Sequence, residues 1–347
     1  MKKLAVCTAL VILASCTASL KPGVWEKDTY KAMNSLLDSR ARSGSYAVFD
    51  CDNTTVIHDV TNTLMLYMIE NLRFASAPEH LFLDGLKDVD FPLEGLGMSA
   101  KEMGQVLSEE YFSLKKELND SLFSDFKARF LAFISAVGDN YDYGTLCLWE
   151  PSLAIGFSQE ELEALGRESL SYWLSTGKAW DEEWVSPDGR FSGTAHKGLV
   201  MTEEMKDLYT CLTSSGITPY VCSASPEWLV ELFCSGMVPG FELPEDQVFG
   251  LRFVENEDGT WSYDADYPQP YMEGKVACID KYMAVRHQGR QPVLVAGDSN
   301  GDVAMLTSYP DMQVGLVIDW DREGAIDELA SCCNGKIFSQ KFSKNLQ

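Results

Sequence analysis

The stretch Tyr46-Ala47-Val48-Phe49-Asp50-Cys51-Asp52-Asn53-Thr54-Thr55 joins an apolar run directly to two carboxylates that are separated by one residue. A short apolar run bounded by turn-forming residues predicts a buried strand of a parallel sheet. Ligands of such sheets bind beyond the carboxyl ends of the strands, where Asp50 and Asp52 would lie. Because residues two apart on a strand share a side, both carboxylates can converge on one site.

Two carboxylates in this position allow two kinds of chemistry. Divalent cations such as Mg²⁺ are bound by carboxylate, carbonyl and water oxygens. One carboxylate can also attack a phosphorus atom while the other transfers a proton. The commoner role of an isolated Asp-x-Asp-Asn string is an Asx-type turn at a strand end, so the motif alone does not decide the function.

The N-terminal residues have the layout of an export signal. Lys2 and Lys3 precede an apolar run over residues 4–13, which is too short to span a bilayer, and small residues follow. Residues Leu13-Ala14-Ser15-Cys16 resemble a bacterial lipoprotein box, which would place a lipidated Cys16 at the mature N-terminus. Ordinary signal cleavage, with Cys16 incidental, is the alternative.

We therefore expect a lipoprotein signal peptide over residues 1–15, followed by a tether and one helix within residues 16–44. No later apolar run reaches the ~20 residues of a membrane span. The protein should thus be exported and held at a bacterial membrane in the cell envelope only by its lipid anchor.

Charge and cysteine usage restrict the partners and the stabilising bonds. The net charge is −24 and no basic cluster occurs, which argues against nucleic acid as a partner. Export permits disulfides among the ten cysteines, but their connectivity cannot be read from the sequence. Cys51 and Cys222 lie at apolar strand ends and resemble buried thiols. The four histidines show no zinc-ligand spacing, so a structural zinc is not predicted.

Residues 59–199 are predicted to form a helical cap inserted after the first strand. Apolar residues recur at helical spacing from about residue 59 to 69 and over 101–118, 122–137 and 159–174. Trp173, Trp180 and Trp184 are seven and then four residues apart, which could place them on one helix face. They would then pack helix against helix, although one or two of the cap aromatics could instead line a ligand cavity.

Residues 45–58 and 200–347 predict an α/β core with a doubly wound parallel sheet. A helix over 205–214 leads to a strand over 217–222. This strand runs into Ser223-Ala224-Ser225-Pro226 and a helix over 227–232. Ser225, directly before Pro226, is the better helix N-cap candidate. That leaves Ser223 to bind a phosphate oxygen beside the helix amides.

The remaining chain predicts a hairpin, a helix and two strands. Residues 248–254 and 260–263 flank a turn sequence. Lys275 opens a helix over 276–286, where the helix dipole disfavours a cation unless an anion is bound nearby. A strand over 292–296 ends in Gly297-Asp298-Ser299-Asn300-Gly301-Asp302, which lacks the glycine and glutamate of an EF-hand loop. Residues 312–318 predict one more strand.

Taken together, these pieces resemble the four-part pattern of the haloacid dehalogenase (HAD)-like phosphatase superfamily. The pattern is a strand followed by Asp-x-Asp, a strand followed by Ser, a Lys at a helix start, and a strand followed by Gly-Asp-x-x-x-Asp. The resemblance covers residues 45–56 and about 205–320, and the chain looks most like the phosphoserine and phosphorylcholine phosphatase branch. It implies a Rossmann-like core with an inserted cap.

The resemblance also implies a role for each matched residue. The implied site consists of Asp50 as nucleophile, Asp52 as general acid and base, Ser223, Lys275 and Thr54 around the phosphate, and Asp50, Asp52 (through its backbone carbonyl), Asp298 and Asp302 around Mg²⁺. One departure concerns Gly301, because phosphoserine phosphatases carry Asn directly before the last Asp. That difference puts a phosphoserine-specific contact in doubt.

The expected activity is Mg²⁺-dependent hydrolysis of a small phosphomonoester through an aspartyl-phosphate. Phosphocholine or phosphoethanolamine is expected ahead of phosphoserine, because the acidic chain favours a cationic leaving group and aromatic rings attract quaternary ammonium groups. The second class is a catalytically silent envelope lipoprotein that uses the same fold as a binding scaffold. The presence of every charged residue of the pattern favours the enzyme.

Overall fold

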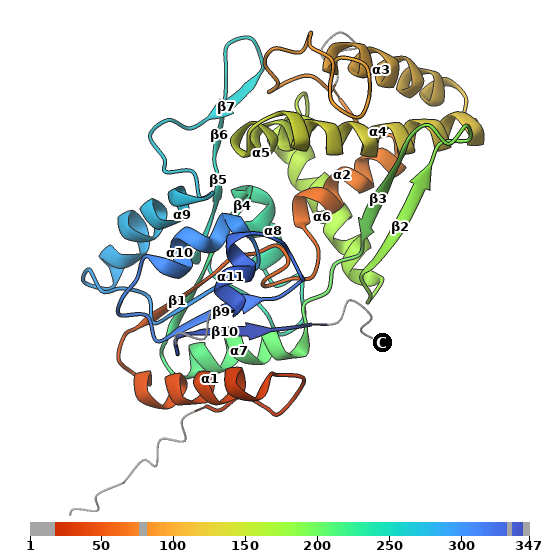
Figure 1. Cartoon of the computed structure of the whole chain (residues 1–347). Helices are drawn as coiled ribbons and strands as arrows, with labels where there is room; N and C mark the ends of the chain where they lie inside the picture. The colour runs from red at the N-terminus through yellow and green to blue at the C-terminus, as the bar shows by residue number, and fades with distance from the viewer. Residues whose placement is uncertain (1–17, 76–81, 332–334, 343–347) are drawn as a thin grey trace, which may run out of the picture.

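The computed structural model describes residues 18–75, 82–331 and 335–342, and a six-stranded sheet forms the centre of its lower half (Figure 1). The strand order is β10-β9-β8-β1-β4-β5, and every neighbouring pair is parallel. The strands are β1 (Tyr46–Phe49), β4 (Thr218–Pro226), β5 (Val248–Leu251), β8 (Leu294–Gly297), β9 (Val314–Ile318) and β10 (Ile337–Gln340). The predicted parallel α/β fold class is confirmed.

Both faces of the sheet are covered by helices, because alternate side chains of each strand point to opposite sides. Ala47 and Phe49 of β1 belong to one apolar core, whereas Tyr46 and Val48 belong to another. The first core includes side chains of α1 (Lys27–Arg40), α7 (Glu203–Ser214) and α8 (Glu227–Cys234). The second includes side chains of α9 (Glu273–Cys278), the π-helical stretch Ile279–Ala284, α10 (Val303–Thr307) and α11 (Ala325–Ser331). The sheet is therefore doubly wound.

Strand β1 lies in the middle of the sheet, between β4 and β8. After β1 the chain proceeds to β4 and β5 on one side and then returns to β8, β9 and β10 on the other. The strand order thus reverses beside β1, and such a switch point leaves a crevice at the carboxyl ends of the strands where ligands bind. Asp50 and Asp298, which follow β1 and β8, lie at this crevice.

Between β1 and α7 the chain forms the upper half of the molecule in Figure 1. Its elements are α2 (Val60–Glu70), α3 (Ala100–Lys116), α4 (Asp120–Asn140), α5 (Tyr143–Ser152), α6 (Gln159–Ser175), β2 (Trp180–Val185) and β3 (Ser192–Lys197). We call this part the insert. We predicted a helical insert, but β2 and β3 form an antiparallel hairpin within it. Trp180 and Trp184 belong to β2. The prediction that they share one helix face with Trp173 is therefore wrong.

Other elements differ from the prediction in their bounds or were not predicted. The residues predicted as one long hairpin divide, so that β5 joins the main sheet while β6 (Phe253–Glu255) and β7 (Trp261–Tyr263) form the hairpin. Short 3₁₀ turns at Glu245–Gln247 and Asn300–Asp302 precede β5 and α10. Helix α5 was not predicted, and its proline, Pro151, lies in the last turn.

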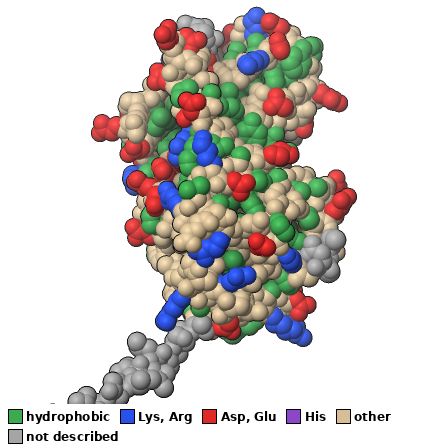
Figure 2. Space-filling view, turned by 90° about the vertical axis from the view of Figure 1, so that its left-hand side faces the viewer, with side chains coloured by type: hydrophobic (Ala, Val, Ile, Leu, Met, Phe, Trp, Pro, Cys, Tyr) green, Lys and Arg blue, Asp and Glu red, His purple; other side chains and the backbone are tan. Residues whose placement is uncertain are grey.

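The predictions for the signal peptide and for lipidated Cys16 lie outside the described residues. Within the described ranges, no helix combines the length and apolar character needed to cross a membrane. The six described cysteines are buried and free, Cys51 and Cys222 among them. Figure 2 shows Lys and Arg on one face in small groups among Asp and Glu, without a continuous basic surface.

Candidate active site

The loop that follows β1 folds tightly and presents Asp50 at the strand end. The amide of Asp50 donates to the carbonyl of Ala296 in β8 at 2.9 Å, which continues the sheet pairing. The hydroxyl of Thr55 donates to the carbonyl of Asp50 at 2.7 Å. Asn53 has a φ of 54°, in the left-handed region that asparagine tolerates better than most residues. These bonds fix the backbone on both sides of the Asp50 carboxylate.

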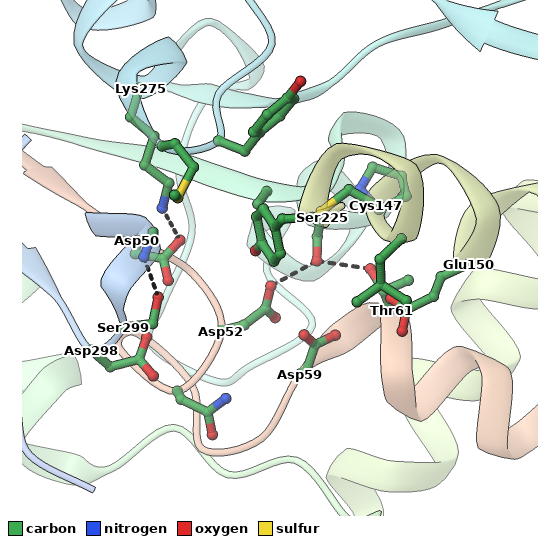
Figure 3. Close-up of a pocket in the computed structure, with 18 of the residues that line it drawn as sticks. Asp50, Asp52, Asp59, Thr61, Cys147, Glu150, Ser225, Lys275, Asp298 and Ser299 are labelled. Atoms are coloured by element: carbon green, nitrogen blue, oxygen red, sulfur yellow. Dashed lines mark hydrogen bonds and ion pairs between the residues drawn. The ribbon is translucent and has the colours of Figure 1, made fainter. Parts of the chain in front are cut away.

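A buried lysine joins Asp50 to the end of β8. The Lys275 ammonium lies 2.7 Å from Asp50 Oδ1 (Figure 3) and 2.6 Å from Asp302 Oδ1. Burial alone would lower the pKa of Lys275, but the carboxylates of Asp302 and Asp50 outweigh it and raise that pKa above its usual value. Lys275 is therefore a permanently charged group, held where a phosphoryl oxygen could meet it.

Both carboxylate oxygens of Asp302 accept hydrogen bonds. Its Oδ2 accepts from the backbone amides of Asp298 and Ser299 at 3.0 and 3.1 Å, and from the Ser299 hydroxyl at 3.1 Å. Its other oxygen receives Lys275. Asp302 thus shapes the turn after β8 and orients the lysine, which agrees with a supporting role.

Asp298 points toward Asp50 from the neighbouring strand end. The hydroxyl of Thr54 donates to Asp298 Oδ1 at 3.3 Å, and Arg322 lies 2.8 Å from Oδ2. One carboxylate oxygen from each of Asp50, Asp298 and Asp302 lies within 4.8 Å of the others. Burial, followed by the charge of Asp302, raises the pKa of Asp50 to about 7 and that of Asp298 well above its ordinary value.

Asp52 is held apart from these three carboxylates by its own hydrogen bonds. Its Oδ1 accepts the backbone amide of Val60 at 2.8 Å, and its Oδ2 accepts the Ser225 hydroxyl at 2.7 Å. The Ser225 hydroxyl in turn accepts from Thr61 at 2.7 Å. Burial and then the charge of Asp59 raise the pKa of Asp52 to about 7. At neutral pH this group can both give and take a proton.

These groups share a cavity of about 230 Å³. Among its described lining residues are five carboxylates and two cationic side chains, namely Asp50, Asp52, Asp59, Glu150 and Asp298 against Lys275 and Arg322. Such an excess of buried negative charge is costly unless protons or bound cations offset it.

Residues 177–307 match the family model of haloacid dehalogenase-like hydrolases, a range that contains Ser223, Lys275, Asp298 and Asp302. The chain contains a HAD-like hydrolase domain. It is 22% identical over 299 residues to the phosphorylcholine phosphatase of Pseudomonas aeruginosa, covering 79% of this chain and 74% of that protein. A solved structure of a protein of unknown function from Anaerococcus prevotii is also similar. It has a TM-score of 0.81 and 26% identity, and the match covers 94% of this chain and 98% of that one.

Within the HAD-like domain, Ser223 and Ser225 lie in the last four residues of β4, which continues beyond the predicted strand end at residue 222. The N-cap of α8 is Pro226, without a side-chain cap, so the prediction that Ser225 caps this helix is wrong. Ser225 instead lines the cavity and binds Asp52. Ser223 is fully buried; its Oγ accepts the Ser225 amide at 3.0 Å and lies 3.4 Å from Asp52 Oδ2. Ser225 is thus the more exposed hydroxyl at this strand end.

Two acidic residues of the cavity were missed by the sequence reasoning. Asp59 caps α2 by accepting the amide of Asn62 at 2.8 Å, and Glu150 lies on α5. Burial raises the pKa of each to about 7, with added repulsion from Glu150 on Asp59 and from Asp52 on Glu150. Among the described residues, neither forms an ion pair with a basic side chain. Figure 3 places both beyond Asp52, on the side away from Asp298.

The aromatic residues of the insert mainly pack. Trp149 and Trp173 are buried, and their indole N–H groups donate to the carbonyls of Phe82 and Thr63 at 2.8 and 2.7 Å. No tryptophan lines the cavity among the described residues, whereas Tyr143 does so together with Tyr271. Tyr143, Cys147 and Glu150 are four and then three residues apart on α5, so this spacing would have revealed the lining face had the helix been recognised.

Asn300 faces away from the cavity of the HAD-like domain. Its Nδ2 donates to the carbonyl of Glu323 at 3.2 Å and its Oδ1 accepts the amide of Ile326 at 3.0 Å. Ser299 and Gly301 line the cavity instead. Asn300 therefore does not replace the asparagine that the phosphoserine-specific pattern places at position 301.

The three converging carboxylates suit a hard divalent cation. The donors are all oxygens, as Mg²⁺ prefers, and all three carboxylates are buried. Burial raises the pKa values of Asp50 and Asp298, and a bound cation would reverse that effect. The side chain of Asp52 does not belong to this group, so its predicted metal role can rest only on its backbone carbonyl.

Proposed function

We propose that this protein is a Mg²⁺-dependent phosphomonoesterase that forms an aspartyl-phosphate on Asp50. The observation that carries the proposal is that Lys275, which lines the cavity with Asp50 at the end of β1, contacts both Asp50 and the buried Asp302. A lysine next to a carboxylate nucleophile can neutralise the phosphoryl group while the nucleophile attacks. The match to HAD-like hydrolases and the similarity to a phosphatase support the same class of enzyme.

Asp50 and Asp298 would hold the Mg²⁺ ion, with Asp302 in support. When bound, the ion supplies positive charge that polarises and positions the phosphoryl group. The protein's own part is to keep the nucleophile ionised. Lys275 does so by its bond to Asp50, which opposes the effect of burial on the Asp50 pKa.

In the first step a carboxylate oxygen of Asp50 forms a bond to phosphorus as the bond from phosphorus to the leaving oxygen breaks. Protonated Asp52 gives its proton to that oxygen, which leaves as an alcohol. The pKa of about 7 keeps a large share of Asp52 protonated near neutral pH. Ser225 and the Val60 amide hold the carboxyl group of Asp52 in place.

In the second step water attacks the phosphorus of the aspartyl-phosphate. Asp52, now a carboxylate, takes a proton from the water, and the bond from phosphorus to Asp50 breaks to release phosphate and restore the enzyme. Ser223, Ser225 and Thr54 are the neighbouring hydroxyls at the strand ends; Ser223 remains our proposal for a phosphate ligand, although it is fully buried.

We further propose that the leaving group carries a positive charge, as in phosphocholine or phosphoethanolamine. Asp52, the proposed proton donor, lies between the phosphoryl end at Asp50 and the acidic pair Asp59 and Glu150 (Figure 3). A cationic head would therefore meet two carboxylates that have no basic partner among the described residues. Tyr143, on the same helix as Glu150, also lines the cavity, and an aromatic ring suits an ammonium group, with a contribution of about 0.5–2 kcal/mol.

Asp50→Asn tests the nucleophile. The amide has nearly the same shape but is a poor nucleophile, so turnover of a chromogenic aryl phosphate should disappear while the folded state remains. Chelation of the metal should silence the wild-type enzyme, and added Mg²⁺ should restore it. Activity within about tenfold of wild type in purified Asp50→Asn protein would refute the assignment.

The catalytically silent scaffold is the less supported alternative. A binding protein has no need for a permanently charged lysine between two buried aspartates, because that arrangement costs desolvation energy. The aryl phosphate assay separates the two classes directly, since a scaffold would not turn over substrate with or without Mg²⁺.

A further inference from the structure

We propose a second metal site, formed by His58, Asp181 and His196, that binds a divalent transition-metal ion of the Zn²⁺ class. The three residues come from distant parts of the sequence, which is why the histidine spacing gave no indication of it. One ligand atom of each lies within 4.8 Å of the others. The site is separate from the carboxylates around Asp50 and is not needed for the proposed chemistry.

The fold brings the three side chains together at the base of the insert. Asp181 of β2 and His196 of β3 are directly paired across the antiparallel hairpin. His58 ends the loop that carries Asp50 and Asp52, just before α2. The rings of His58 and His196 have centroids 5.6 Å apart. The site therefore joins the point where the chain enters the insert to the hairpin through which it leaves.

The hydrogen bonds of His58 favour a metal-binding tautomer. Its Nδ1 lies 3.1 Å from the carbonyl oxygens of Lys197 and Gly198. Because carbonyl oxygens only accept, Nδ1 carries the proton, and the neutral ring then presents the lone pair of Nε2. This nitrogen faces Asp181 Oδ1 at 3.6 Å. A backbone carbonyl that orients the remote nitrogen is the usual support of a metal-bound histidine.

The distances suit a tetrahedral ion after a small adjustment. Ligands about 2.1 Å from a tetrahedral zinc are about 3.4 Å from one another. The distance from His58 Nε2 to Asp181 Oδ1 is close to this value, whereas His196 Nδ1 lies 2.7 Å from the same oxygen and would have to move away. The side chains of Asp181 and His196 are 42% and 48% exposed, so they can adjust and leave room for a water ligand.

The donor set separates this site from the carboxylate cluster. Two imidazoles and one carboxylate suit Zn²⁺, Cu²⁺ or Ni²⁺, whereas Mg²⁺ prefers oxygen donors only. Excess Mg²⁺ can therefore occupy the Asp50 cluster while Zn²⁺ remains free to bind at the hairpin. This difference allows the proposal to be tested without reference to catalysis.

The test is a Zn²⁺ titration of the folded protein in excess Mg²⁺, followed by calorimetry and by thermal unfolding. We expect one Zn²⁺ to bind and Tm to rise by about 3 °C or more near saturation. His196→Ala and Asp181→Asn should each weaken binding at least about tenfold and reduce the rise in Tm. Both residues are partly exposed, so the variants should still fold.

Two controls complete the experiment. Glu183→Gln changes another carboxylate of β2 and should leave Zn²⁺ binding unchanged. Asp298→Asn removes a carboxylate of the other cluster and should also leave it unchanged. The proposal is overturned if Zn²⁺ does not bind to the wild type, if the hairpin variants bind it as the wild type does, or if Asp298→Asn abolishes the binding.

Discussion

At the residue scale, the acidic side chains of the cavity lie on two sides of Asp52 (Figure 3). Asp50, Lys275, Asp298 and Asp302 could be predicted because each follows a strand or opens a helix in a recognisable order. Asp59 and Glu150 could not, because a helix cap and a glutamate on an unrecognised helix have many ordinary uses. Only the fold places them beside Asp52.

Glu150→Gln tests the proposed recognition of a cationic leaving group. The change removes one negative charge and leaves the side-chain shape, so kcat/KM for phosphocholine should fall about 5- to 30-fold, while that for glycerol phosphate stays unchanged. Glu150 is preferable to Asp59, whose carboxylate also caps α2. Steady-state kinetics on phosphocholine, phosphoethanolamine, phosphoserine and glycerol phosphate provide the measurement.

A matched control is Glu160→Gln, which removes an exposed carboxylate of α6 that does not line the cavity. It should change neither substrate's kcat/KM. Equal losses on both substrates in Glu150→Gln would show a structural effect instead of recognition. If wild-type kcat/KM for phosphocholine and phosphoethanolamine is no higher than for glycerol phosphate, the proposal of a cationic leaving group is wrong. Only the proposed phosphatase chemistry would then remain.

At the scale of elements, strong periodicity was a better guide than spacing between single aromatic residues. The buried strands β1, β4, β8 and β9 and most long helices could be predicted, because continuous apolar runs and helical repeats reflect burial directly. Trp180 and Trp184 fit a helix by their spacing of four, but an even spacing also places two residues on one face of a strand. Their cross-strand pairing in the hairpin depends on contacts that the local sequence does not contain.

The end of β8 supplies an element-scale prediction. A Cβ on Gly297 would lie 2.5 Å from Cγ of Asp302, so only glycine lets the turn after β8 come back this closely to its own strand. Gly297→Ala should displace Asp302 and, through it, Lys275. A displacement of about 1 Å in a catalytic group can cost 10²-fold in rate, and kcat should fall by about this factor.

The comparison variant is Gly138→Ala in α4, where the added methyl would meet only Leu146 at 3.8 Å. Its activity and thermal stability should equal or slightly exceed those of the wild type. Circular dichroism would verify that Gly297→Ala keeps its sheet. A Gly297→Ala protein with wild-type kcat would mean that the position of Asp302 does not matter for turnover.

At the scale of the whole molecule, the order of the strands in the sheet explains how residues far apart in the sequence meet in one candidate active site. The insert leaves the sheet after β1 and returns before α7, so Asp50 and Lys275 are brought together by strand order and not by proximity in the chain. The parallel core could be predicted from its buried strands. The placement of the insert over the cavity, through Tyr143 and Glu150 of α5, could not.

The last prediction concerns where the protein is held, and it rests on the sequence alone, since residues 1–17 lie outside the described structure. We propose that the chain is exported and anchored by a lipid on Cys16, because a basic start, a short apolar run and Leu-Ala-Ser-Cys occur in the order of a lipoprotein signal. Cys16→Ser should move the protein from the membrane to the soluble fraction, because the change removes the thiol that would carry the lipid. Cys7→Ser, a change within the apolar run, should leave it membrane-bound. Inhibition of lipoprotein signal processing should accumulate the unprocessed precursor. If neither this inhibition nor Cys16→Ser alters fractionation, Cys16 is not the anchor.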